Sequence, residues 1–135
     1  MAASSQRPLE LIQARNLLSS VSTPALLVNQ PGDVIFYNEA AAAILGQRFE
    51  ETGTLSAHDW VCTFGPFDEH GEPLPLERQP LTAALRANRP GHAVHRIRSA
   101  AGADYDIEVS GVPIVGGDGF QGAMVFFWAI REASR

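Results

Sequence analysis

The chain has 135 residues, 45 % of them hydrophobic, which is enough sequence for one domain with one core. Ten basic residues against 15 acidic ones give a net charge of −5 at pH 7, which argues against direct nucleic-acid binding because phosphate contacts rely on positive charge. All the basic residues are arginine, which excludes Schiff-base and phosphate-loop lysine chemistry. The single cysteine, Cys62, excludes an internal disulfide.

The sequence carries no targeting segment that we recognise. Its first residues lack the charged and apolar regions of a secretory signal. The longest apolar run, residues 123–130, is far shorter than the roughly 20 residues that cross a bilayer. We therefore expect a cytoplasmic protein that makes no contact with a membrane.

The first third of the chain predicts a helix, a hairpin and a second helix. Apolar residues recur every three or four positions and predict an amphipathic helix that ends near Ser22. These residues are Leu11, Ala14, Leu18 and Val21. Residues 25–29 and 34–37 read as two strands joined by a tight turn. Asn38 then suits the N-cap of a short helix that stops at Gly46.

The middle of the chain, residues 47–79, has no sustained period because glycine and proline interrupt it. We expect one or two helical turns and an extended piece there. Pro80 suits the first turn of a longer helix, which closes before Gly91.

Three strands complete the chain, at residues 93–98, 105–115 and 120–130. The apolar phase of the second strand slips near residues 111–113, which predicts a β-bulge. The last strand is apolar on both faces, so both must be covered. Short helices and an aromatic segment suit one face, and the amino-terminal helix or a partner subunit suits the other.

Three segments together resemble the PAS domain family. They are GDVIFYNEAAAAILG, HGEPLPLERQPLTAALRANRPG and GADYDIEVSGVPIVGGDGFQGAMVFFWAI, within residues 21–130. The resemblance implies an α+β fold with a five-stranded antiparallel sheet, short helices on one face and an amino-terminal amphipathic helix. It divides the chain into a helical cap at residues 1–20, a PAS-like sensor domain at 21–131 and a carboxy-terminal stub at 132–135.

The resemblance also implies a sensory module without enzyme activity. Such a domain binds a small molecule in an internal pocket and dimerises to control a signalling or transcriptional partner, whose identity the sequence leaves open. One alternative is a ligand-free interaction scaffold whose pocket is filled by its own aromatic residues. A further alternative is an enzyme on a similar small cone-shaped fold, which would need His95, Tyr105 and Asp59 to converge.

The cofactor remains unknown, and the sequence argues against two common ones. Haem-binding members of the family use a histidine on the long helix, where this chain has none. Flavin photochemistry needs a cysteine in an Asn-Cys-Arg segment, whereas we expect Cys62 to be a small buried hydrophobe. His58 and Asp59, like the acids beside His70, lack tight ligand spacing, so we predict no metal site.

His95 is the candidate polar residue of the pocket. It shares the inward phase of its strand with Ile97, and a buried polar group without a partner costs roughly 1–3 kcal/mol. It is either a core histidine bonded to Tyr105 or a backbone carbonyl, or a polar contact for a ligand. The predicted ligand-binding residues are Trp60, His95, Tyr105, Ile107, Val109, Val125 and Phe127.

The opposite face of the last strand presents large apolar residues that need a cover. Either the amino-terminal helix packs on its own sheet, or two copies form a homodimer through helices and outer sheet faces. The residues predicted for this packing are Leu11, Ala14, Leu18, Val21, Met124, Phe126 and Trp128.

Overall fold

Five antiparallel strands form one sheet in the order β2-β1-β5-β4-β3 in the computed structural model, which describes residues 9–132. The predicted cap residues 1–8 and stub residues 133–135 lie outside the described residues. The strands are β1 Ala25–Asn29, β2 Val34–Tyr37, β3 Gly91–Arg98, β4 Asp104–Gly116 and β5 Gly119–Glu132. The helices are α1 Leu9–Ser19, α2 Glu39–Leu45, α3 Phe49–Thr52, α4 Ala57–Thr63, α5 Pro80–Arg86 and the 3₁₀ turn η2 Leu76–Arg78. The predicted α+β class and sheet are confirmed.

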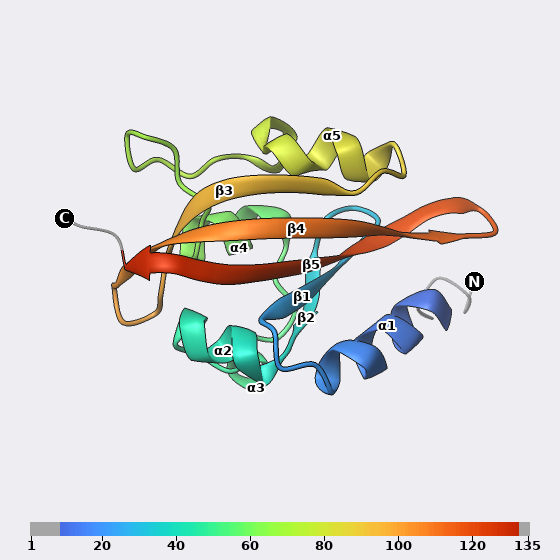
Figure 1. The fold of residues 1–135 in the computed structure, drawn as a ribbon, viewed down its shortest axis with the longest axis horizontal. Helices are drawn as coiled ribbons and strands as arrows, with labels where there is room; N and C mark the ends of the chain where they lie inside the picture. The colour runs from blue at the N-terminus through green and yellow to red at the C-terminus, as the bar shows by residue number, and fades with distance from the viewer. Residues whose placement is uncertain (1–8, 133–135) are drawn as a thin grey trace.

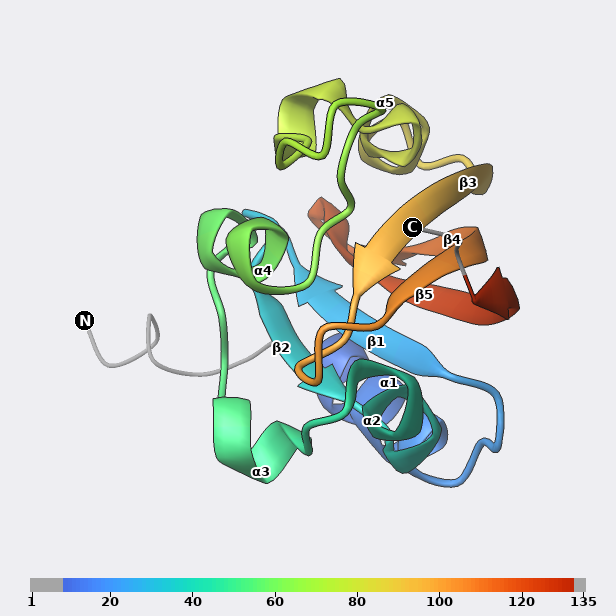
Figure 2. The ribbon, with the colours of Figure 1, turned by 90° about the vertical axis from the view of Figure 1, so that its left-hand side faces the viewer.

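Helices cover both faces of the sheet, but over different parts of it. Figures 1 and 2 show α4 and α5 on one side of the strand layer, and α5 contacts β3 and β4. We call this side the inner face. On the opposite, outer face, α1 contacts β1, β4 and β5. A second, smaller core lies under α1, formed by Leu11, Ala14, Leu18, Ala25, Leu27, Ile35, Phe36 and Ile114. The helix predicted near the amino terminus therefore packs on its own sheet.

Helix α1 ends at Ser19, three residues before the predicted end. The chain tightens there, because the N–H groups of Ser20 and Val21 donate to carbonyls only three residues back, at Leu17 and Leu18. Val21 consequently lies in the turn after the helix and is half-buried.

Asn38 caps α2 as predicted and also ties three segments together. Its Oδ1 accepts hydrogen bonds from the N–H of Ala41 in α2 (3.0 Å) and of Ala25 in β1 (3.1 Å). Its Nδ2 lies within 3.2 Å of three carbonyl oxygens in the segment that follows α1. These belong to Leu18, Val21 and Thr23. The Asn38 side chain is only 4 % exposed, so water has little access to these backbone groups. The side-chain amide therefore makes the hydrogen bonds that water would make at the surface.

The predicted bulge at residues 111–113 is wrong, because these residues pair in regular register with β5. The irregularities fall between Asp106 and Ile107, and again between Ile114 and Val115. The change of apolar phase has another cause. Where β4 passes under α1, its outer face is the buried one, and Ile114 belongs to the core below that helix.

Residues 47–79, which lack a periodic pattern of apolar residues, contain α3, α4 and η2. This is a little more helix than the one or two turns predicted. Each of these elements is short, which is why no apolar period survives long enough to be recognised. Within residues 9–132, no helix is long and apolar enough to cross a membrane.

Candidate functional site

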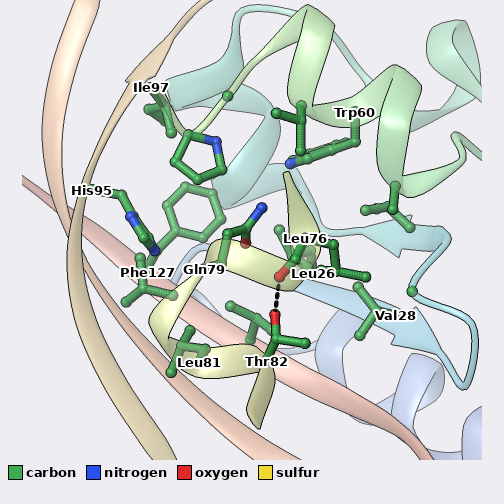
Figure 3. A pocket seen from close by; sticks show the side chains of 18 of the residues that line it. Leu26, Val28, Trp60, Leu76, Gln79, Leu81, Thr82, His95, Ile97 and Phe127 are labelled. Carbon is green, nitrogen blue, oxygen red and sulfur yellow. Dashed lines mark hydrogen bonds between the residues drawn. The ribbon is translucent and has the colours of Figure 1, made fainter. Parts of the chain in front are cut away.

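A cavity of about 130 Å³ lies between the inner face of the sheet and the helices α4, η2 and α5 (Figure 3). All five strands contribute to its wall, and most of the lining side chains are aliphatic. The polar side chains in the wall are Trp60, Gln79, Thr82 and His95. An apolar cavity with a few polar groups is the usual form of a small-molecule site.

The structure places six of the seven predicted ligand-binding residues around this cavity. They are Trp60, His95, Ile107, Val109, Val125 and Phe127. Tyr105 is not among the lining residues. It shares the inner face, but it lies two positions nearer the β3–β4 turn than Ile107, opposite Ile97. Strand alternation predicts which face a residue occupies, but it does not predict where along the strand a cavity ends.

Sequence reasoning missed Gln79 and Thr82, which line the cavity from the segment around η2 and α5. Thr82 Oγ1 donates to the carbonyl oxygen of Leu76 at 2.5 Å, the dashed line in Figure 3. Gln79 Nε2 donates to the carbonyl oxygen of Leu74 at 3.0 Å. Both side chains hold the backbone around η2 in place. Their position beside a proline-rich turn was the sequence signal for such side-chain to backbone bonds.

His95 differs from these two residues because it has no such partner. Its Nε2 is fully buried and makes no hydrogen bond within the described part of the chain. Of the two alternatives for His95, a bond to Tyr105 or to a backbone carbonyl is therefore not made by this atom. Burial lowers the pKa of His95, so the imidazole is neutral at pH 7. The cavity wall thus contains a neutral, unpaired polar atom in apolar surroundings.

An aromatic chain supports the α4 side of the cavity. The Trp60 ring lies 4.9 Å from that of Phe64 and 5.8 Å from that of Tyr37, which in turn lies 5.5 Å from Phe49. The Tyr37 hydroxyl donates to the carbonyl oxygen of Gln47 at 2.7 Å, and burial raises the pKa of that hydroxyl. These aromatic side chains pack on one another and do not fill the cavity. This argues against the ligand-free scaffold, whose pocket would be filled by its own aromatic residues.

Comparison with known proteins decides the fold. No protein-family model matches the chain, and no curated protein is similar to it in sequence. Among solved structures, the PAS domain of a protein from Colwellia psychrerythraea aligns with a TM-score of 0.61 and 17 % identity over 89 % of this chain and 96 % of that one. The Rhodobacter sphaeroides LOV protein aligns with a TM-score of 0.72 and 15 % identity over 92 % of this chain and 69 % of that one. This chain has the PAS fold.

A third PAS structure supports the same conclusion over nearly the whole domain. The PAS domain of nitrogen regulation protein NR(II) from Vibrio parahaemolyticus aligns with a TM-score of 0.60 and 16 % identity, over 87 % of this chain and 97 % of that one. The resemblance seen in the sequence is thereby confirmed for the fold. Identities this low leave the site to be argued from this chain's own residues.

The cavity of this PAS fold does not fit the larger cofactors. About 130 Å³ is close to the roughly 150 Å³ of an apolar cavity that accepts one benzene molecule. The three fused rings of a flavin, or a haem, need a larger space. Cys62, the one residue that could react with a flavin, is exposed and does not line the cavity.

The prediction that Cys62 is buried is wrong, for a reason visible in α4. The helix turns Val61 and Phe64 toward the core, so Cys62 points outward, where its Sγ lies 3.7 Å from Nε2 of exposed His58. Both residues line a surface depression that shares Ala57, Val61 and Leu76 with the cavity wall. Within residues 9–132, no three His, Cys, Asp or Glu side chains gather as a metal site would require.

The outer face of the PAS sheet is covered only in part. Met124 and Phe126 are half-buried against the core below α1. Trp128 lies beyond the helix and is 39 % exposed, with its Nε1 donating to Glu108 Oε1 at 3.4 Å. The exposed apolar residues of the β3–β4–β5 outer face include Val94, Val112 and Trp128. Of the predicted packing set, Leu11, Ala14 and Leu18 are buried within the chain.

Proposed function

We propose that this PAS-fold chain is a sensory domain that binds a small molecule in its inner cavity. Binding would control a signalling or transcriptional partner, and the domain performs no reaction of its own. The observation that carries the proposal is the apolar cavity of about 130 Å³ whose wall holds the unpaired, buried Nε2 of His95. A buried polar atom without a partner is costly, and a ligand that bonds to it removes that cost.

Strand β5 supplies a route by which binding could reach the surface. Val125 and Phe127 line the cavity, while their neighbours Met124 and Phe126 pack toward α1 on the other face. A ligand that moves β5 therefore also moves the residues on which α1 rests. We propose that the signalling partner contacts α1 and the exposed outer face beside it.

Dimerisation through that outer face is the second part of the proposal. Val94 on β3 is 61 % exposed and pairs with Glu108 on β4. Glu108 in turn pairs with Trp128 on β5, so Val94 and Trp128 lie on the same face of the sheet. Exposed apolar residues on a sheet face are typical of a protein interface. Light scattering at micromolar concentrations should give the mass of a dimer, and Val94→Arg should give a monomer.

The matched control is Val115→Arg, because Val115 is 51 % exposed at the far end of the β4–β5 hairpin. It should remain dimeric. A monomeric wild-type protein would remove this part of the proposal and leave the ligand part standing.

The enzyme alternative receives little support from the site. It needs His95, Tyr105 and Asp59 to meet in the cavity, but neither Tyr105 nor Asp59 lines it, and Asp59 is exposed. The negative net charge supports a protein partner over direct contact with nucleic acid. We propose the cytoplasm as its location.

Native mass spectrometry and an absorption spectrum of the purified protein test the ligand. We expect a stoichiometric small molecule on the wild type, lost in Val125→Phe, which places a larger side chain into the cavity. Val112→Phe is the matched control, because Val112 lies on the outer face of the same hairpin and is 39 % exposed. A protein that is empty when purified, and that binds nothing from a metabolite extract, would favour the scaffold alternative.

A further inference from the structure

We propose that the cavity selects an uncharged, single-ring molecule with one hydroxyl group, and that this hydroxyl bonds to Nε2 of His95. The inference rests on the proposed function, since it requires the cavity to bind a small molecule. It adds a ligand class and a residue that recognises it. Three properties of the wall determine which ligand fits: its size, its lack of charge and its unpaired polar atom.

The size of the cavity limits the ligand to about one ring. A volume of about 130 Å³ is slightly below the roughly 150 Å³ of an apolar cavity known to hold benzene. The wall consists mostly of Leu, Ile, Val and Phe side chains on well-packed strands and helices. Such walls adapt by small rotamer changes, so a ring with one or two substituents fits and a fused ring system does not.

The charge of the wall excludes an ionised ligand. No Arg, Asp or Glu is among the lining residues, and the nearest titratable side chain is the neutral imidazole of His95. Ion pairs do exist on this part of the sheet, but Arg96 and Arg98 point to the outer face, where they bind Asp106 and Asp104. A carboxylate in the cavity would thus be desolvated without a counter-charge.

Among the fully buried side-chain nitrogen and oxygen atoms of residues 9–132, one lacks a hydrogen-bond partner. The Thr82 hydroxyl and the Gln79 amide already donate to backbone carbonyls of the η2 segment. His95 Nε2 is buried and unpaired within the described residues. A neutral imidazole nitrogen is a donor in one tautomer and an acceptor in the other. A hydroxyl group both donates and accepts, so it pairs with either tautomer, whereas a carbonyl pairs with only one.

Titration calorimetry with three compounds of one shape tests the ligand class. The compounds are 4-methylphenol, toluene and 4-methylbenzoate, measured near neutral pH on the wild-type protein. We expect 4-methylphenol to bind roughly tenfold tighter than toluene, the effect of about one satisfied buried hydrogen bond. We expect 4-methylbenzoate to bind more weakly than either.

Variants of His95 test the recognising residue. In His95→Leu, 4-methylphenol should lose its roughly tenfold advantage while toluene still binds, and His95→Gln should recover part of it. His92→Leu, which removes an exposed imidazole of the same strand that bonds to Glu108 and does not line the cavity, should leave the advantage unchanged. If the variants are unstable, the ¹⁵N chemical shift of Nε2 in the wild type replaces them, because it should respond to 4-methylphenol and not to toluene.

The outcomes separate this inference from the function on which it rests. If toluene binds as tightly as 4-methylphenol, or 4-methylbenzoate binds tightest, the ligand class is wrong although the cavity still binds molecules. If 4-methylphenol keeps its advantage in His95→Leu, or loses it equally in His92→Leu, the recognising residue is wrong. If none of the three compounds binds, this inference falls, whereas the binding function of the cavity falls only if native mass spectrometry also finds no bound molecule.

Discussion

The side-chain amide of Asn38 donates a hydrogen bond to the carbonyl oxygen of Leu18, which is 20 residues earlier in the chain and 3.1 Å away. Leu18 is the most deeply buried residue of α1, and Asn38 begins α2. The bond therefore fixes the end of the outer helix to the edge of the inner layer. The same side chain also accepts a bond from Ala25, so the first strand starts from this anchor as well.

Asn38→Ala should lower the free energy of unfolding by at least about 2 kcal/mol. It removes the cap of α2 and leaves several buried backbone groups unpaired, each of which costs roughly 1–3 kcal/mol when water cannot reach it. Urea unfolding followed by circular dichroism measures the change. Asn16→Ala, on the exposed side of α1, should alter the same value by less than about 0.5 kcal/mol. Equal effects at the two positions would contradict the anchoring role.

Leu18→Ala should destabilise the protein by about 2–5 kcal/mol, because it opens a space in the core between α1 and the sheet. Leu17→Ala is the matched control, since Leu17 is the adjacent residue of the same helix and is 54 % exposed. Thermal unfolding of both variants gives the comparison. A small effect at Leu18 would mean that α1 is only loosely attached to the outer face.

Gly32→Ala should destabilise the wall of the cavity. An added Cβ at Gly32 would lie 2.5 Å from Cδ2 of Leu76, in a backbone conformation with φ of +102°. Gly119→Ala has a similar φ of +96° and open space around the new Cβ, so it isolates the conformational cost. Leu76 is half-buried and Cδ2 is the end of a flexible side chain, so we expect Gly32→Ala to cost about 0.5–1.5 kcal/mol more than Gly119→Ala, the cost of turning Leu76 away from its preferred rotamer.

The double variant Gly32→Ala with Leu76→Ala completes this test. Removing the Leu76 side chain relieves the overlap, so the double variant should be more stable than the sum of the two single effects implies. Strict additivity in urea unfolding would show that Leu76 does not limit the space at Gly32.

The stability of the protein should fall as the pH drops below about 6.5, and His95 should account for part of the loss. Burial lowers the pKa of His95 in the folded state below its ordinary value of 6.5. The unfolded chain therefore binds a proton at a pH where the folded chain does not, which favours unfolding. The contribution is fully present above pH 6.5 and is lost as the pH falls through the folded-state pKa.

Urea unfolding at a series of pH values from neutral to mildly acidic should show a steeper loss for the wild type than for His95→Leu. His70→Leu is the control, because His70 is exposed on a loop. It should follow the wild-type slope. Parallel curves for the wild type and His95→Leu would show that the imidazole titrates alike in the folded and unfolded chain.

The sequence could predict what depends on local patterns, and it missed what depends on distance between elements. The caps, the strands and the inward direction of His95 follow from residue type and alternation. Tyr105 has the right alternation but lies past the end of the cavity, and no local pattern records that length. Gln79 and Thr82 reach the cavity because η2 folds back over it, which only the assembled structure reveals.

The alternating side chains of β5 also restrict how the length of this chain can change. Cavity residues and α1-facing residues follow one another singly from Met124 to Phe127, and the pairing with β1 is continuous from Gly122 to Phe126. One inserted residue there would turn the next cavity residue toward α1 and the next α1 contact into the cavity. Insertions between Gly116 and Gly119 would leave this order intact, because they only lengthen the hairpin turn. Among natural variants of this sequence, we expect length differences to gather in that turn and to be absent from residues 123–128.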